Sequence, residues 1–350
     1  TAQAAGITVR MITGDHFETA YHIGRELGLV HHRSEVFDSR QMSMMSDDDL
    51  AERLKTIRVC ARVLPEYKHR ILEILKQRDI TAMTGDGVND IPALTNAHVG
   101  VAMGSGAQIA KDAGDIILLD NNFQSIVSAI HEGRTVYANI KRMVTYLLST
   151  NLGEVLVSLG SLIVGLPLPL TPVQILWINI VTDSAMVIPI GMEPGEARNM
   201  KQPPKPANAP LLSTFMISRI IIMALLMAVL VLTLYALFDH WHGADYARTV
   251  AFCALATVQW AGAFEARSDY ESLFRRIKKR NTPFLIGLFI AVGLQLIAVA
   301  SPFAPYLHVT PITVIDFAIV TTVAFVLPII VLELHKWFGR TFLGKRPELN

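Results

Sequence analysis

The sequence predicts two parts: a soluble α/β part over residues 1–142, followed by an all-α membrane part over residues 143–350. Three observations predict this division. Charged residues make up 17% of the chain and its mean hydropathy is +0.39, whereas average soluble domains carry roughly 25% charged residues. The second part holds six long apolar stretches. In the first part, short apolar runs alternate with amphipathic segments, which is typical of a parallel sheet with crossover helices.

The composition excludes several classes of protein. The chain has 350 residues with 31 basic and 30 acidic side chains, a net charge of +1. Disorder is excluded by the high hydrophobicity, and a nucleic-acid partner is not expected because phosphate binding needs a basic surface. Two cysteines in so long a chain exclude a disulfide scaffold. The sequence begins at Thr1 without an initiator Met or a signal peptide, so we expect it to be part of a longer polypeptide.

The elements of the first part are read from apolar periodicity. We expect strands at 7–12, 59–63, 80–83, 99–103 and 116–119, and helices at 16–27, 47–56, 66–77 and from 92 onward. Ser46 is the expected N-cap of the second helix, because three aspartates follow it at the positive end of the helix dipole. Gly28 is expected to close the first helix.

Polar turns follow two of these strands, and functional residues of parallel sheets sit at the carboxyl ends of strands. The first turn is Thr13-Gly14-Asp15, and the second is Thr84-Gly85-Asp86-Gly87-Val88-Asn89-Asp90. Asp86, Asn89 and Asp90 supply oxygens that suit Mg²⁺. Lys68 is placed to reach a phosphate, and the amides around Gly14 can cradle phosphoryl oxygens at a helix N-terminus. An ordinary Asp-Gly turn is the alternative interpretation of either segment.

The second part is expected to cross a membrane six times, since a spanning helix needs about 20 mostly apolar residues. The spans lie near 143–166, 172–191, 215–238, 249–264, 283–303 and 312–332. The fourth is short and is alternatively a buried helix. The segments near 195–205, near 267–280 and in the tail carry 13 Lys and Arg, whereas the alternate loops carry only Arg248. The positive-inside rule then places the soluble part and the C-terminus in the cytoplasm.

Polar groups at membrane depth are costly and therefore point to function. They are Asn151 and Glu154 in the first span, and Asn179, Thr182 and Asp183 in the second. Within each span the spacing places them on one helix face. Two carboxylates with amide and hydroxyl oxygens make a site for a hard cation. Pro189 and Gly191 are expected to unwind the second helix and free carbonyls. The alternatives are hydrogen bonds that only join helices, or carboxylates kept protonated.

These motifs resemble the P-type cation-transporting ATPases. The segment 84–90 resembles the hinge motif of that family, and segments 11–15, 65–70 and 101–104 resemble its surroundings. The membrane part resembles the same family from Tyr146 through Asp183. The resemblance implies the C-terminal part of a haloacid-dehalogenase-like phosphorylation domain, followed by transmembrane helices five to ten. It is closest to the type II branch of calcium pumps and sodium/potassium pumps.

The resemblance implies roles in phosphoryl transfer, where positioning and charge stabilisation carry most of the catalysis. Asp86 would bind the Mg²⁺ that bridges to the phosphoryl group, supported by Asn89 and Asp90, of which Asp90 is a second candidate ligand. Lys68 would neutralise charge on the phosphoryl oxygens. Thr13 and Gly14 would hydrogen-bond the same group, with Asp15 shaping the turn.

The resemblance also implies the cation ligands. In calcium pumps, the positions that match Asn151, Glu154, Asn179, Thr182 and Asp183 bind the cation. A further ligand in those pumps, a glutamate, matches Gln259, which is uncharged and binds divalent ions less strongly. Sodium/potassium pumps carry a Gln-Trp pair like Gln259-Trp260, but have Asp where this chain has Asn179. The pattern therefore predicts Ca²⁺ export with one weakened position, and Na⁺ and Mn²⁺ stay open.

Several parts of the family's machinery do not occur in this sequence. The phosphorylated aspartate of that family lies in Asp-Lys-Thr-Gly, and no such run is present. We expect the chain to be the C-terminal part of a multi-pass pump of the plasma membrane. Its missing N-terminal part would bind most of the ATP, so the chain alone should be inactive. The alternatives are a non-catalytic membrane partner subunit and a membrane-anchored phosphatase.

Overall fold

The computed structural model describes residues 2–196, 198–206 and 209–342. The chain divides into two compact units, one comprising Thr1–Arg134 with Glu196–Ala209 and the other Thr135–Gly195 with Pro210–Asn350. The segment Glu196–Ala209 connects two helices of the second unit in sequence, yet it belongs to the first unit. The sequence division had placed it with the membrane part.

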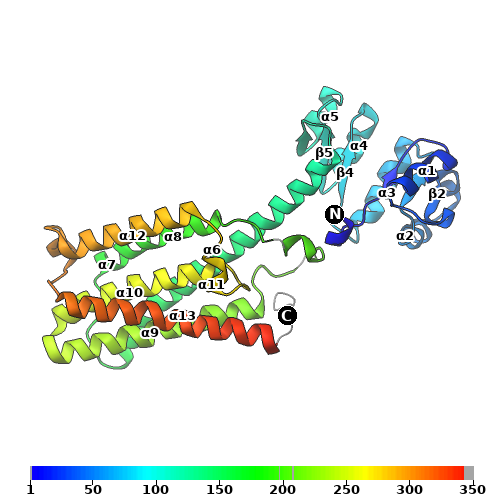
Figure 1. Ribbon diagram of the computed structural model, residues 1–350. Coiled ribbons are helices and arrows are strands. Elements are labelled where there is room, and N and C mark those ends of the chain that lie inside the picture. The colour runs from blue at the N-terminus through cyan, green and yellow to red at the C-terminus, as the bar shows by residue number, and fades with distance from the viewer. Residues whose placement is uncertain (1, 197, 207–208, 343–350) are drawn as a thin grey trace. The chain divides into compact units, whose positions relative to one another are not determined.

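The first unit contains two separate parallel sheets of three strands each (Figure 1). The order in the first sheet is β1-β3-β2, and its elements along the chain are β1 (Met11–Ile12), α1 (Phe17–Glu26), β2 (Val36–Asp38), α2 (Asp47–Leu54), β3 (Val59–Ala61) and α3 (Pro65–Lys76). The order in the second is β4-β5-β6, with the elements β4 (Ala82–Gly85), α4 (Ile91–Asn96), β5 (Val99–Met103), α5 (Gln108–Ala113) and β6 (Ile116–Leu118). The expected parallel pairing and crossover helices are present, but they form two sheets instead of one.

Local sequence signals account for most of these elements. Ser46 caps α2 as expected, because its Oγ accepts a hydrogen bond from the backbone N–H of Asp49 at 3.1 Å. Gly28 follows α1 with a φ of +68°, a conformation that favours glycine. Strand β2 was not predicted, since its three residues, Val36–Asp38, are too few to show a period. All three are buried, so tertiary packing makes this strand.

Apolar side chains on both sides of the first sheet form its core. One cluster includes Phe37, Leu50, Ile57 and Ile71, which join α2 and α3 to the sheet. A second, smaller cluster includes Val59 and packs α1 on the opposite face. Burying each large aliphatic side chain contributes about 1.5–3 kcal/mol. These two clusters hold the end of β1, from which the first polar turn begins.

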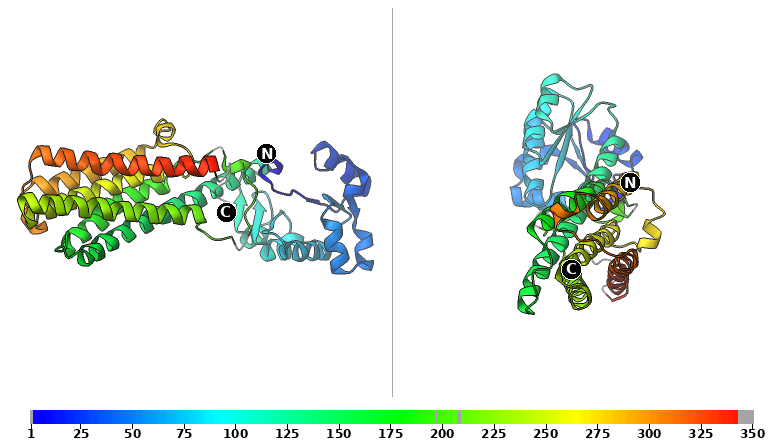
Figure 2. Two further views of the ribbon diagram at one scale, coloured as in Figure 1. Left: turned by 90° about the horizontal axis from the view of Figure 1, so that it is seen from below. Right: turned by 90° about the vertical axis from the view of Figure 1, so that its left-hand side faces the viewer.

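The second unit is a bundle of long helices (Figure 2). Its elements are α6 (Phe123–Ile163), which belongs to this unit from Thr135 onward, α7 (Pro172–Trp177), the π-helical segment η5 (Ile178–Asp183), α8 (Ser184–Gly191), α9 (Thr214–His242), α10 (Ala244–Ala266), α11 (Leu273–Arg276), α12 (Thr282–Ala300) and α13 (Val314–Phe342). Helix α6 has 41 residues and begins at Phe123, well before the expected start of the first span. The helix is continuous through its polar first half and its apolar second half. The change in hydropathy near residue 143 therefore marks the start of the apolar span and not the start of the helix.

Five helices in the described part of the chain are long and apolar enough to cross a membrane: α6, the α7–α8 segment, α9, α12 and α13. The fourth expected span, α10, is a helix of 23 residues but is not among the five. Nearly all of its residues from 247 to 266 are buried, and it packs against both α9 and α13. Because protein covers α10, small and polar residues replace the large apolar side chains that lipid contact favours.

Candidate functional site

The loop that follows β4 is shaped around the buried carboxylate of Asp90. One oxygen of Asp90 accepts hydrogen bonds from the backbone N–H groups of Asp86 and Gly87, each at 3.3 Å. Asp90 is only 6% exposed. At Gly85 a Cβ atom would lie 2.5 Å from the Cβ of Asp90, so only glycine permits this close approach. The turn is therefore held in one shape by its own residues.

Lys68, near the start of α3, completes the contacts of Asp90. Its Nζ lies 2.7 Å from the second oxygen of Asp90, and the two side chains are 21% and 9% exposed. Both oxygens of Asp90 are thus engaged. The structure brings Lys68 to the second Gly-Asp turn although 22 residues separate it from Asp90. Its amino group lies beside the turn as a positive charge suited to a phosphoryl group.

Asp86 and Asn89 are exposed at the same turn. In the part of the chain that the structure describes, the carboxylate of Asp86 takes part in no hydrogen bond or ion pair. Its backbone carbonyl is fixed, because it accepts the N–H of Ala107 at 3.0 Å. A carboxylate with free oxygens at the carboxyl end of a strand fits the ligand requirements of Mg²⁺. Asp90 is buried and doubly engaged, which suits orientation of the loop better than metal binding.

The first Gly-Asp turn lies at the carboxyl end of β1, in the other sheet. The Oγ1 of Thr13 donates to Asp15 at 2.7 Å and accepts the N–H of Asp15 at 3.2 Å. Gly14 is exposed between them. No hydrogen bond or ion pair among the described residues joins this turn to the segment 84–90. The structure therefore shows two preformed turns, each at the end of an edge strand, β1 and β4.

In the membrane unit, the second polar segment coincides with the π-helical segment η5. This segment covers Ile178–Asp183 and includes Asn179, Thr182 and Asp183. A π-helical turn inserts an extra residue into the helix and often marks a functional site. The expected unwinding at Pro189 is not found, since α8 continues through Pro189 to Gly191. The departure from α-helical geometry lies at the polar residues themselves.

Glu154 of α6 is buried against amide groups from two other helices. One carboxylate oxygen accepts a hydrogen bond from Asn179 Nδ2 at 2.9 Å, and the other accepts one from Gln259 Nε2 at 2.8 Å. Glu154 is 6% exposed. Three segments, α6, η5 and α10, therefore meet at this carboxylate. The expected convergence of Glu154, Asn179 and Gln259 is present in the geometry.

Asp183 is the second buried carboxylate, and it is 3% exposed. It accepts hydrogen bonds from the phenol of Tyr146 at 3.1 Å and from Thr150 Oγ1 at 3.2 Å. Tyr146 and Thr150 were not singled out as site residues. The signal was available, because Tyr146, Thr150 and Glu154 follow one another at intervals of four and share one face of α6.

Two buried oxygen atoms near these carboxylates, Thr182 Oγ1 and Gln259 Oε1, have no hydrogen-bond partner among the residues that the structure describes. Buried polar atoms are normally paired, and an unpaired one calls for an explanation such as a bound ion or water. Asn151 is placed differently, because its side chain is exposed and its Nδ2 donates to the carbonyl of Leu147 at 2.7 Å. The structure does not bring Asn151 to the carboxylates.

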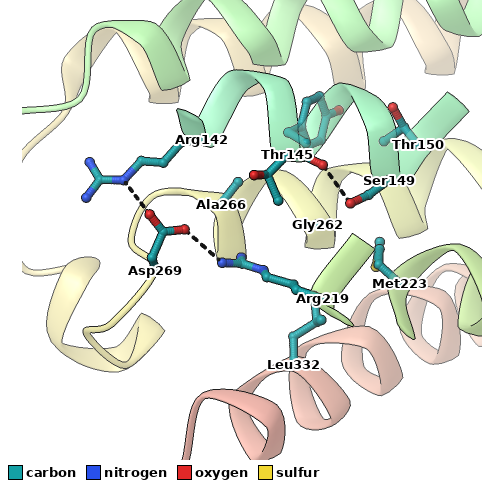
Figure 3. Close-up of a pocket in the computed structure, with 11 residues that line it drawn as sticks. Arg142, Thr145, Ser149, Thr150, Arg219, Met223, Gly262, Ala266, Asp269 and Leu332 are labelled. Carbon is teal, nitrogen blue, oxygen red and sulfur yellow. Dashed lines mark hydrogen bonds and ion pairs between the residues drawn. The ribbon is translucent and has the colours of Figure 1, made fainter. Parts of the chain in front are cut away.

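A pocket lies beside this cluster and shares two of its residues (Figure 3). Tyr146 and Thr150 line the pocket and also bond to Asp183. Elsewhere in its wall, Asp269 lies between two buried arginines, 3.7 Å from Arg142 and 3.3 Å from Arg219. These three charged residues form an ion-pair network in the wall of the pocket.

Comparisons with known proteins agree with both halves of this geometry. Residues 167–338 match the family described as "Cation transporting ATPase, C-terminus". Residues 1–98 and 70–130 match two families described as "haloacid dehalogenase-like hydrolase". The chain belongs to the P-type cation-transporting ATPases. The predicted haloacid-dehalogenase-like half followed by membrane helices is confirmed, and the chain is part of an integral membrane protein.

Individual relatives align over most of this chain. The calcium-transporting ATPase of Bacillus subtilis (strain 168) is 37% identical over 322 residues, which cover 90% of this chain and 36% of the relative. The calcium-transporting ATPase 1 of Bacillus cereus is 36% identical, covering 95% and 39%. The probable cation-transporting ATPase F of Mycobacterium tuberculosis is 40% identical, covering 81% and 32%. The chain thus spans between 32% and 39% of the length of these curated relatives.

Proposed function

We propose that this chain is the C-terminal part of an ATP-driven pump that exports Ca²⁺ from the cytoplasm across the plasma membrane. Relatives named as calcium-transporting ATPases support the choice of Ca²⁺. The basic segments between alternate spans support a cytoplasmic first unit. The same oxygen-rich site also suits Mn²⁺, and Na⁺ is the monovalent alternative. A non-catalytic subunit that retains this half would keep the fold without the transport.

The observation that carries the proposal is the pair of buried carboxylates, Glu154 and Asp183. Both lie in candidate membrane spans, and the hydrogen bonds found for them come from neutral amide and hydroxyl groups. Buried charges are costly without a counter-charge, and a divalent cation supplies two positive charges. The unpaired oxygens of Thr182 and Gln259 are available as further ligands. Cation binding would require the amide groups of Asn179 and Gln259 to present oxygen toward the ion.

In the first unit, the residues fit a phosphoryl-transfer site. Asp86 would hold Mg²⁺, whose charge offsets that of the phosphoryl oxygens. Asp90 would keep the loop and Lys68 in place, and Lys68 would face the transferred group. Thr13 and Gly14 would donate hydrogen bonds to the same group from the other turn. Asn89 would support the Mg²⁺ ligand from its exposed position.

The phosphorylated aspartate would come from another part of the same pump. Strands β1 and β4 are edge strands, and each ends in one of the two turns. An unpaired strand edge offers backbone groups to a further strand. A single parallel strand between β1 and β4 would join the two sheets and bring both turns to its carboxyl end. We place the nucleophilic aspartate at the end of that strand, so the chain by itself should form no phosphoenzyme.

The test uses the full-length polypeptide that contains this chain. It is purified and incubated with Mg²⁺ and ATP, and acid-stable phosphoenzyme is measured with Ca²⁺, Mn²⁺ or Na⁺ as the only added transport cation. The proposal predicts that Ca²⁺ supports phosphorylation at a lower concentration than Mn²⁺ or Na⁺ does. Dependence on Mn²⁺ or Na⁺ alone would change the cation. A polypeptide that forms no phosphoenzyme with any of the three would contradict the pump assignment.

A further inference from the structure

Glu193 lies just beyond the C-terminal end of α8 and is one of the most deeply buried charged groups of the membrane unit. It is 1% exposed. Its carboxylate accepts two hydrogen bonds from Arg267 at 3.1 Å each and one from Arg276 at 2.9 Å. Asn281 donates a further one. All three donors lie in the connection between the end of α10 and the first turn of α12. One carboxylate therefore bonds to the beginning, the middle and the end of this connection.

The same face of α8 is docked on α12 along its length. Ala185, Pro189 and Glu193 follow one another at intervals of four residues. A Cβ on Gly287 of α12 would lie 2.2 Å from the carbonyl oxygen of Ala185, so the two backbones are in close contact. Asn281 donates to the carbonyl of Pro189 at 3.3 Å. These contacts hold α8 at two successive turns, and the carboxylate of Glu193 holds the chain just beyond it.

Pro189 explains why this docking is needed. Proline has no backbone N–H, so the carbonyl of Ala185 lacks its helical donor and α8 is locally weakened. Two carbonyls at and just beyond the end of α8 accept hydrogen bonds from Asn139 of α6, Gly191 at 3.1 Å and Glu193 at 2.8 Å. Glu193 is therefore the point at which α6, α8 and the connection to α12 are joined.

A buried carboxylate with two guanidinium partners is a poor way to gain stability, because desolvation offsets most of the attraction. Such a group is better explained by the geometry it imposes. Helix α8 continues directly into η5, which carries Asn179, Thr182 and Asp183. The position of α8 therefore sets the position of these side chains relative to Glu154 on α6.

We propose that Glu193 is a positioning residue for the cation site: by holding the C-terminal end of α8, it fixes the π-helical segment that presents Asn179, Thr182 and Asp183. This inference rests on the proposed function for its effect on cation affinity. The structural part, that Glu193 restrains Ile178–Gly191, holds independently of which cation is carried.

The test is Glu193→Gln in the full-length polypeptide, with Glu271→Gln as the matched control. Glu271 belongs to the same charged group, because its carboxylate lies 2.9 Å from Lys279 and 3.5 Å from Arg276. It differs from Glu193 in being partly exposed and in making no hydrogen bond or ion pair with α8 among the described residues. Two quantities are measured: the Ca²⁺ concentration for half-maximal phosphorylation, and amide hydrogen exchange in residues 178–191. Glu193→Asp, which keeps the charge and shortens the side chain, is the second variant in case Glu193→Gln does not fold.

The proposal predicts faster exchange in residues 178–191 and an increase of about tenfold in the half-maximal Ca²⁺ concentration, with unchanged phosphorylation at saturating Ca²⁺. Tenfold is the lower end of the effect of removing groups that only orient metal ligands. The control should change neither quantity. Unchanged exchange in residues 178–191 overturns the proposal, as does unchanged affinity in a variant with faster exchange. If the parent protein shows no Ca²⁺ dependence, the proposed function fails, and the exchange result still decides whether Glu193 fixes α8.

Discussion

Gln259 offers a sharp test of the cation site, because replacing it with Glu exchanges a neutral amide that donates a hydrogen bond for a carboxylate of similar shape. Its Nε2 lies 2.8 Å from a carboxylate oxygen of Glu154. In Gln259→Glu, that donor becomes a second carboxylate facing the first. Two unit charges about 4 Å apart repel by about 4 kcal/mol at an effective dielectric constant of about 20. This energy corresponds to roughly a thousandfold change in an equilibrium constant.

The variant should therefore bind one proton between the two carboxylates when no cation is present. A cation must displace that proton, so binding becomes linked to pH. As the pH rises from 6 to 8, we expect the half-maximal Ca²⁺ concentration of the variant to fall more steeply than that of the parent. The additional decrease should be at most about tenfold per pH unit, because one proton is displaced. At the alkaline end, the added charge should make the variant bind Ca²⁺ more tightly than the parent.

The assay is Ca²⁺-dependent phosphorylation of the full-length polypeptide at pH 6, 7 and 8. Gln295→Glu is the matched control, because Gln295 is also a buried glutamine in a membrane helix but contacts Trp177. The control should keep the pH dependence of the parent. If Gln259→Glu also keeps it, Gln259 does not face Glu154 in the binding state and the site is wrongly assigned.

Three further predictions concern the first unit. Asp86→Asn should lower the initial rate of phosphorylation by roughly 100-fold or more at low Mg²⁺, and a rate equal to that of the parent across a Mg²⁺ titration would exclude Asp86 as its ligand. Gly85→Ala should destabilise the first unit by about 1–3 kcal/mol, since its Cβ would meet Asp90; an unchanged denaturation midpoint would show that the loop relaxes freely. Burial raises the pKa of the Cys60 thiol to about 12, so at pH 8 only roughly one Cys60 side chain in 10,000 is the reactive thiolate. Rapid maleimide labelling of Cys60 in the folded protein would contradict this.

The sequence was sufficient for the fold wherever a pattern is local. Strand β5 has the expected bounds, and Ser46 caps α2 as expected. The sequence was not sufficient where the outcome depends on partners distant in the chain. A single parallel sheet was expected because strands and helices alternate along the chain, but β1 and β4 lie in two separate sheets and do not pair with each other. The number of strands is local information, whereas pairing between them is not.

The same distinction applies to the cation site. Membrane depth alone identified Glu154 and Asp183, because a carboxylate there is costly. Helical spacing placed Asn151 with Glu154, but the side chain of Asn151 is exposed. An interval of three residues leaves room for the two side chains to lie at opposite margins of one face. Tyr146 was missed because a tyrosine in a membrane helix is commonly a packing residue, and only the fold shows its hydroxyl on Asp183.

Binding of the transported cation by Asp183 is tested most directly by cation-dependent phosphorylation by ATP of the full-length polypeptide carrying Asp183→Asn. The matched control is Asp316→Asn, which removes a carboxylate near the start of α13, where it bonds to Tyr246 and Thr313. We predict that Asp183→Asn abolishes Ca²⁺-dependent phosphorylation, whereas Asp316→Asn leaves its Ca²⁺ dependence intact. Phosphorylation of Asp183→Asn with the Ca²⁺ dependence of the parent would contradict the claim that this buried carboxylate binds the transported ion.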